Sequence, residues 1–152
     1  MSIQITGRII IHTDGSAKPN PGTGGWAVII DAGPEEPLTL SGGKARSTNN
    51  EMELTAILHA MMWLRDNGSP PAVIHSDSRY AIGCISQWAA GWDRRGWRKA
   101  GGPIQNLELI KVMLALSRSL DLHWQWVKGH SGVRWNHLAD TLAEAARKEA
   151  VP

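Results

Sequence analysis

Short runs of apolar residues, separated by turn-forming residues, occupy the N-terminal third of the chain. The runs lie at residues 8–14, 26–30 and 38–41, and the last of them alternates apolar with polar positions. Such runs are typical of β-strands, whereas the glycine, proline and asparagine of residues 14–22 and the loop at 31–37 favour turns. Because the connections are short, we expect these three strands to form an antiparallel meander.

The spacing of apolar residues changes to that of a helix after residue 48. One face of this helix would contain Leu54, Ile57, Leu58, Met61 and Leu64. Thr48 and Glu51 stand three residues apart at its start, as in a capping box, and Asn67-Gly68 ahead of two prolines predicts its end.

Strands and helices alternate in the second half of the chain. Strands are expected at 72–76 and 122–127, and helices at about 78–88, from Pro103 to about 117, and at 135–150, with irregular basic and tryptophan-rich residues after Trp88. Helical crossovers join the last strands, so the first, fourth and fifth strands should run parallel, with the meander on one side. We therefore predict an α/β fold in one domain.

Length and composition agree with one soluble domain. The chain has 152 residues and 42% hydrophobic content, which suits a buried core, and its net charge of +2 gives only weak support for nucleic-acid binding. The one cysteine, Cys84, excludes an internal disulfide and is expected to be buried, as in a reducing compartment. No segment has the pattern of a secretion signal or a membrane span, so we expect a cytoplasmic protein without membrane contact.

Two aspartates follow closely similar segments. Ile11-His12-Thr13-Asp14 and Ile74-His75-Ser76-Asp77 each run from apolar residues into an aspartate where a strand is expected to end. In a parallel pair both aspartates would lie at the carboxyl edge of the sheet, where open α/β sheets bind ligands. For either aspartate alone, a turn or a helix cap is the favoured explanation. Two matching strand ends favour a shared site.

Two further acids lie on predicted helices. The stripe that contains Glu53 also contains Ile57, Ala60 and Leu64. The charge of Glu53 would therefore face the sheet, although the helix dipole favours an anion in the first turn and leaves a structural role equally open. The buried stripe near Asp140 is expected to contain Leu138, Leu142 and Ala145. Taken alone, Asp140 beside that stripe is typical of a solvated surface acid.

Convergence of the four acids would create a site for divalent cations. Two carboxylates ~4 Å apart repel by about 4 kcal/mol at an effective dielectric near 20. Such a cluster needs protons or cations, and oxygen ligands favour magnesium or manganese over zinc, for which the chain has no cysteine and histidine spacing. Two such ions would suit phosphoryl displacement. Metal-dependent phosphodiester chemistry follows as a hypothesis.

Motifs in five regions of the chain resemble one family. They are Asp14-Gly15-Ser16 with Asn20-Pro21-Gly22, Thr48 to Leu54, Ser76-Asp77-Ser78, Trp124 to His130, and Asn136 to Asp140. In this order, over about residues 8–147, they resemble bacterial-type ribonuclease HI. The resemblance implies one catalytic domain, residues 1–152, with the ribonuclease H-like fold, a five-stranded mixed sheet of an antiparallel meander plus parallel strands, flanked by helices.

The resemblance also implies an activity. It implies an endonuclease that hydrolyses the RNA strand of RNA–DNA hybrids, leaving 5′-phosphate and 3′-hydroxyl ends. The implied ligands of two Mg²⁺ ions, with Mn²⁺ as a possible substitute, are Asp14, Glu53, Asp77 and Asp140. One ion would activate water, and the other would stabilise the departing 3′ oxygen. His130 would assist the reaction or product departure from a mobile loop; without the motif it would be an ordinary surface histidine.

Residues that hold the hybrid follow from the same resemblance. They are Asn20, Asn49 and Asn50 for the minor groove, Arg46, Thr48 and Asn106 for a DNA phosphate, Tyr80 and Trp88 under the DNA sugars, and Arg94 and Arg95 in a basic protrusion at 91–99. Plainer alternatives stay open: Thr48 only caps its helix, Trp88 belongs to the core, and the protrusion is a solvated loop. We expect the protein to act as a monomer.

The chain departs from the family pattern at several positions outside the carboxylates. Asp93 replaces a basic residue, Gly101-Gly102 replaces a charged stretch, Ile110 replaces a tryptophan, and Arg79 adds a cation beside the proposed metal site. Two rival functions are a hybrid-binding module that has lost catalysis and a DNA nuclease of related fold. The intact carboxylates argue against the first, and the basic protrusion with the loop at 128–130 argues against the second.

Overall fold

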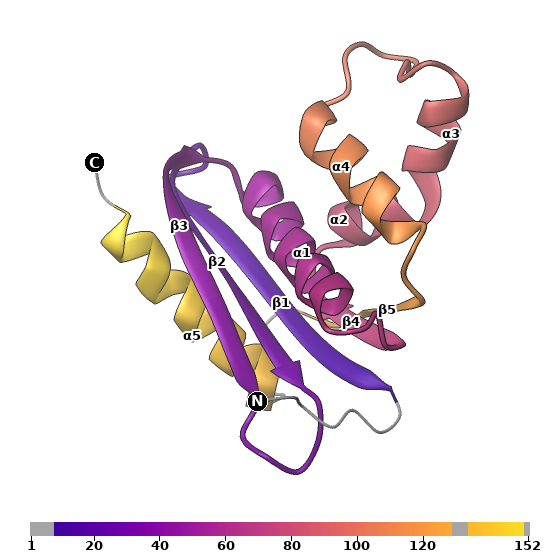
Figure 1. The fold of residues 1–152 in the computed structure, drawn as a ribbon. Helices are drawn as coiled ribbons and strands as arrows, with labels where there is room; N and C mark the ends of the chain where they lie inside the picture. The colour runs from indigo at the N-terminus through magenta and orange to yellow at the C-terminus, as the bar shows by residue number, and fades with distance from the viewer. Residues whose placement is uncertain (1–7, 129–133, 151–152) are drawn as a thin grey trace.

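The computed structural model describes residues 8–128 and 134–150, and a five-stranded sheet lies at its centre (Figure 1). Its strands are β1 (Ile9–Lys18), β2 (Gly22–Asp31), β3 (Leu38–Ser47), β4 (Ala72–Ser76) and β5 (Leu122–Trp126). They lie in the order β3-β2-β1-β4-β5. The first three strands pair antiparallel, whereas β4 and β5 run parallel to β1, so the predicted mixed sheet is confirmed.

Helices cover both faces of the sheet. One face holds α1 (Asn49–Asp66), followed by α2 (Arg79–Gly83), the π-helix η1 (Cys84–Trp88), α3 (Ala89–Arg94) and α4 (Leu107–Ser117). The other face holds α5 (Arg134–Glu149), which packs against the meander (Figure 1). No helix in the described part of the chain has the length and apolar character that crossing a membrane requires.

The main core lies between the sheet and α1. Strand β1 contributes Ile9 and Ile11, and the helix contributes the predicted stripe that includes Ile57 and Leu64, all of them buried. Cys84 is also fully buried, as expected, and burial raises the pKa of its thiol to about 11. The aliphatic side chains in this layer remove apolar surface from water and thereby fix α1 over β1.

Three strands are longer than the sequence pattern predicts. β1 does not end at Asp14 but continues to Lys18, β2 begins at Gly22 rather than Trp26, and β3 continues to Ser47. The β1–β2 ladder persists as far as the pair Lys18 and Thr23, so the turn formers act only at residues 19–21. Cross-strand pairing therefore overrides the local turn preference of the aspartate and glycine at 14–15.

The region between β4 and β5 differs most from the prediction. The helix expected at about 78–88 is divided into α2 and η1, and residues 89–94, expected to be irregular, form α3. The helix expected from Pro103 begins instead at Leu107, because Asn106 has a φ of 58° and a left-handed residue cannot continue a right-handed helix.

Candidate active site

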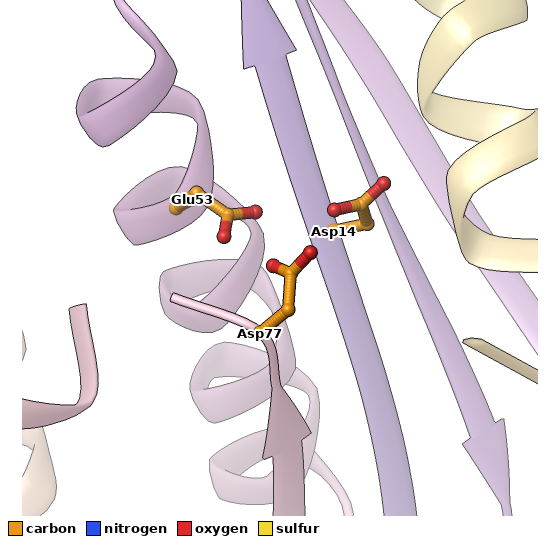
Figure 2. A group of neighbouring side chains, drawn as sticks. All are labelled: Asp14, Glu53 and Asp77. Atoms are coloured by element: carbon orange, nitrogen blue, oxygen red, sulfur yellow. The ribbon is translucent and has the colours of Figure 1, made fainter. Parts of the chain in front are cut away.

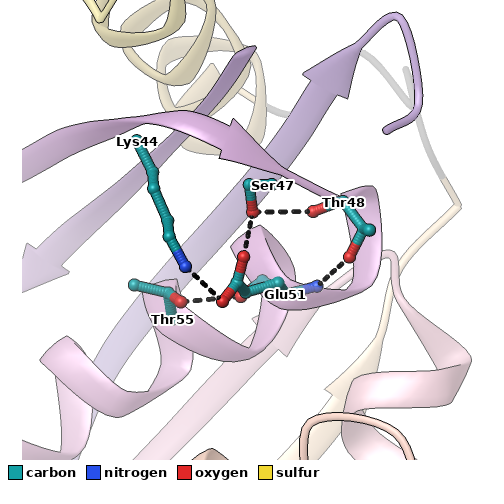
Figure 3. A network of polar contacts seen from close by, with 5 residues as sticks. All are labelled: Lys44, Ser47, Thr48, Glu51 and Thr55. Atoms are coloured by element: carbon teal, nitrogen blue, oxygen red, sulfur yellow. Dashed lines mark hydrogen bonds and ion pairs between the residues drawn. The ribbon is translucent and has the colours of Figure 1, made fainter. Parts of the chain in front are cut away.

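A polar network fixes the first turn of α1 against the end of β3 (Figure 3). Thr48 Oγ1 accepts a hydrogen bond from the Glu51 amide at 3.1 Å, which confirms the predicted cap. The Glu51 carboxylate accepts from Lys44 Nζ at 2.8 Å and from Ser47 Oγ at 2.5 Å. Burial raises the pKa of Glu51, but the Lys44 and Ser47 contacts outweigh it, and the pKa lies below its ordinary value. The start of α1 is thus held in one position relative to the sheet.

Gly15 brings α1 close to β1. A Cβ at this position would lie 2.6 Å from the backbone nitrogen of Glu53, too close for any side chain. Strand β4 ends at Ser76, whereas β1 continues, and the last β1–β4 pair is His12 with His75. Beyond that pair the edge of β1 is open, and the Glu53 side chain reaches the sheet there.

Three carboxylates meet at this opening (Figure 2). Asp14 comes from β1, Glu53 from α1, and Asp77 from the residue directly after β4. Ligand oxygens of the three lie within 4.8 Å of one another. Glu53 is only 7% exposed, although its side chain is a carboxyl group, and Asp77 is open to solvent. The structure therefore brings together three of the four acids expected to form the site.

The cluster favours protons over charge when no cation is bound. Burial, followed by the charge of Asp77 and a hydrogen bond with Asp140, raises the pKa of Asp14 to about 8. Burial also raises the pKa of Glu53 well above its ordinary value, and Asp14 and Asp77 add to the effect. Desolvation and like-charge repulsion act in the same direction on both groups. A divalent cation among them would reverse that preference.

Asp140 is the fourth acid of this region. It lies on α5, lines the same cleft and is near enough to raise the pKa of Asp14, although it lies outside the closest group of three. The prediction of which α5 residues beside Asp140 are buried is wrong. The buried residues of this helix are Ala139 and Ala143, whereas Leu138 and Leu142 are partly exposed and Ala145 is exposed.

Small residues explain why α5 packs against the sheet through a different face from the one that the sequence predicts. A Cβ at Gly25 would lie 2.5 Å from the backbone nitrogen of Arg147, and one at Gly43 would lie 2.7 Å from Ala146 O. The helix backbone therefore rests directly on the glycines of β2 and β3, and only alanine fits between them. Asp140 follows Ala139 on this inward side, so it faces the cleft rather than bulk water.

The donor set fits a hard divalent cation. Every candidate ligand is a carboxylate oxygen, which magnesium and manganese prefer. Glu53 Oε1 is buried and has no hydrogen-bond partner among the described residues. A buried charged oxygen without a partner is costly, and a bound cation is the simplest group to satisfy it.

The carboxylates lie in an open cleft of about 610 Å³. Other polar residues that line it are Ser16, Lys18, Asn49, Asn50, Ser78, Lys128, Asn136, His137 and Glu144. Asn49 Oδ1 accepts from the Ala17 amide at 2.7 Å, and Asn20 Oδ1 accepts from the Asn49 amide at 3.0 Å. Two of the predicted minor-groove residues therefore line the cleft, and the third holds one of them.

The remaining predicted contact residues lie outside this cleft. Asn106 Nδ2 donates to Tyr80 Oη at 3.2 Å, and Trp88 is 43% exposed, so it is a surface residue rather than core. Tyr80 and Trp88 line a separate hollow of about 350 Å³ with Trp92, Lys99, Ile104 and Gln105. Arg46, Arg94 and Arg95 are exposed. His130 lies outside the described residues.

One polar group beside the carboxylates has no assigned role from the sequence. His12 Nδ1 lies 2.5 Å from Asn136 Oδ1, and the His12 ring contacts that of His75 with centroids 4.7 Å apart. Burial lowers the pKa of His12 by more than the hydrogen bond with Asn136 raises it, and His75 lowers it further. The signal was present, because each histidine precedes an aspartate by two residues and so shares its face of the strand.

Comparisons with known proteins match this chain to ribonuclease H proteins. A model of the RNase H family matches residues 6–148. A ribonuclease H of Methylorubrum extorquens (strain PA1) is 41% identical over 144 residues, which are 95% of this chain but only 62% of that protein. A ribonuclease H of Acidiphilium cryptum (strain JF-5) is 43% identical over 150 residues, covering 97% and 91% of the two chains.

A solved structure has the same fold. LC11-RNase H1, solved in complex with an RNA/DNA hybrid, superimposes with a TM-score of 0.70 at 23% identity, over 94% of this chain and 99% of that one. At this identity the likeness concerns the fold alone.

Proposed function

The chain belongs to the RNase H family, and on that premise we propose that it is an endonuclease that hydrolyses the RNA strand of RNA–DNA hybrids. The expected products carry 5′-phosphate and 3′-hydroxyl ends. The observation that supports this most strongly is the meeting of Asp14, Glu53 and Asp77 in an open cleft that Asp140 also lines.

We propose that these four carboxylates hold two magnesium ions, for which manganese can substitute. When bound, such ions supply charge stabilisation at the reacting phosphate and an activated water. Glu53 contributes the partnerless buried oxygen, and Asp77 contributes an exposed carboxylate at the cleft entrance. Asp77 and Asp140 both raise the pKa of Asp14, so Asp14 links the group of three to the acid on α5.

The polar lining of the cleft suits a nucleic-acid backbone and its minor groove. Asn49 and Asn50 present amides beside the carboxylates, where a 2′-hydroxyl distinguishes RNA from DNA. Thr48 caps α1 through its oxygen, and its hydroxyl hydrogen is still able to bond a phosphate beside Arg46. Both expected roles of Thr48 are therefore compatible.

The second hollow suits the DNA strand. Tyr80 and Trp88 offer apolar surface for sugars, and Asn106 lies beside Tyr80 within hydrogen-bonding distance. Arg94 and Arg95 at the end of α3 add positive charge on the protrusion. Asp93 is paired with Arg118 at 2.7 Å, which reduces its repulsion of a nearby phosphate. We further propose that His130 assists product departure, and that the protein acts as a cytoplasmic monomer.

Cleavage of three labelled substrates tests the proposal. A hybrid, an RNA duplex and a DNA duplex of one sequence are incubated with magnesium, with manganese and with a chelator. We expect cutting of the RNA strand of the hybrid only, and none with the chelator. Equal cutting of all three duplexes would reject the substrate, and cutting in the chelator would reject the metal.

A further inference from the structure

A second polar layer lies directly beneath the carboxylates. His12, His75 and Asn136 come from β1, β4 and α5; Asp14 lies on the same strand as His12, Asp140 on the same helix as Asn136, and Asp77 directly after β4. His12 precedes Asp14 by two residues on a strand, and Asn136 precedes Asp140 by four on a helix. Those intervals place both residues on one face of the element. The lower layer therefore repeats the arrangement of the upper one.

The contacts of this layer join β1 to α5 and to β4. Asn136 Oδ1 can only accept, so His12 Nδ1 donates the hydrogen bond between β1 and the first turn of α5. The two histidine rings pack at an angle of 48° across the parallel pair β1–β4. His12 is 4% exposed, so water does not compete for its donor.

The buried part of the α5 interface is made of small residues. Its buried side chains are Ala139 and Ala143, and the helix backbone at Ala143 and Ala146 lies against Gly25 and Gly43, so no large buried side chain of α5 interlocks with the sheet to oppose sliding. A directional hydrogen bond one turn before Asp140 supplies the missing restraint. The same hydrogen bond orients the Asn136 amide, because Asn136 Nδ2 is buried and has no hydrogen-bond partner among the described residues.

We propose that His12 is a positioning residue that sets the place of Asp140 at the cation site through its hydrogen bond to Asn136. The inference rests on the proposed function for its link to catalysis, but cation affinity tests it independently. His12 touches neither substrate nor reacting atoms. It acts on the helix that presents the fourth carboxylate to Asp14.

Three variants separate the effect of the His12 hydrogen bond from the effect of its aromatic ring. His12→Phe keeps an aromatic ring and removes the donor. His12→Asn places an amide N–H near the position of Nδ1 and retains the donor. His59→Phe removes another partly buried histidine, stacked on Trp26 away from the cleft, and serves as the matched control. Magnesium affinity by calorimetry, kcat and KM on a hybrid, and thermal unfolding without cation are measured for each.

We expect His12→Phe to lose 10- to 100-fold in magnesium affinity and in kcat, at nearly unchanged KM, as is usual when a residue that orients a ligand is removed. His12→Asn should recover most of both, and His59→Phe should resemble the wild type. Wild-type affinity in His12→Phe, or equal impairment of the Phe and Asn variants, would overturn the inference. A wild type that binds magnesium but leaves hybrids intact would reject the proposed function, and the affinities alone would then decide the inference.

Discussion

Glu53 is the residue on which the candidate site depends most, because it is an acid held in a nearly dry position. Its carboxylate lies beside Asp14 and Asp77, and Oε1 has no hydrogen-bond partner among the described residues. Folding therefore places a group there that destabilises the protein unless a proton or a cation compensates it. A purely structural position would be occupied more stably by glutamine or leucine.

Replacement of Glu53 by glutamine separates a role in catalysis from a purely structural role. The substitution keeps the volume and removes the charge, so we expect cleavage of the hybrid to fall by roughly 100-fold or more, with the cation-free protein at least as stable as the wild type. Kinetics and thermal unfolding measure the two effects. Glu35→Gln, at an exposed glutamate in the loop between β2 and β3, is the control and should retain cleavage. Loss of stability in Glu53→Gln, with activity intact, would contradict a catalytic role.

The sequence anticipates individual residues only as far as local spacing carries information. Glu53 stood out because its helix stripe is otherwise apolar, and the structure buries it as that stripe requires. Asp140 did not stand out, since leucines on α5 suggested a different inward face. The glycines that make room for alanine lie more than ninety residues earlier in the chain, and no local pattern connects them with α5.

At the scale of elements, the crossing of α1 over β1 determines the geometry of the site. Gly15→Ala would introduce a Cβ within 2.6 Å of the backbone of Glu53, and neither element can yield without moving a carboxylate. We expect a loss of roughly 1–3 kcal/mol in stability and a larger fractional loss in kcat than in substrate binding. Gly33→Ala, where a Cβ meets nothing within 4 Å, is the control. Chemical unfolding and steady-state kinetics measure both, and an unaffected Gly15→Ala enzyme would contradict the close crossing.

The inward face of α5 permits an equally direct test. Ala143 is fully buried, whereas Ala145, two residues later, is exposed. Ala143→Leu should therefore destabilise the protein by roughly 1–3 kcal/mol, because the added carbons must push the helix from the sheet. The identical change at Ala145 should have little effect on the free energy of unfolding in urea. The opposite ranking would support the leucine-lined face that the sequence suggests.

The bounds of a helix or strand could be predicted where a single local sequence pattern determines them. The bounds of β4 agree with the prediction and those of α1 lie close to it, because buried strands and capped helices have strong local signals. The segment from α2 to α4 was not predictable in detail. Its packing around Trp92 and Trp97 and the left-handed Asn106 depend on tertiary contacts that outweigh local preference.

For the whole molecule, the carboxylate cluster links stability to pH and to divalent cations. Asp14 has a pKa of about 8 in the folded cation-free protein against an ordinary value of 3.8. Below pH 3.8 the group is protonated in both folded and unfolded chains and costs nothing. As pH rises from about 4 to 8 the unfolded chain ionises first, so the folded state loses stability relative to it, and above pH 8 the loss is complete.

We therefore expect the cation-free protein to become less stable as pH rises across this window, by up to a few kcal/mol for a group this deeply buried. Asp14→Asn should reduce the slope, since asparagine does not ionise, and the slope that remains should come from the buried Glu53. Magnesium should stabilise the wild type more at pH 8 than at pH 5, because binding displaces a proton at the lower pH. Thermal unfolding of both proteins at several pH values, with magnesium and with a chelator, measures all three effects. A slope in Asp14→Asn as steep as that of the wild type, or magnesium stabilisation that is independent of pH, would mean that the three acids do not share one site.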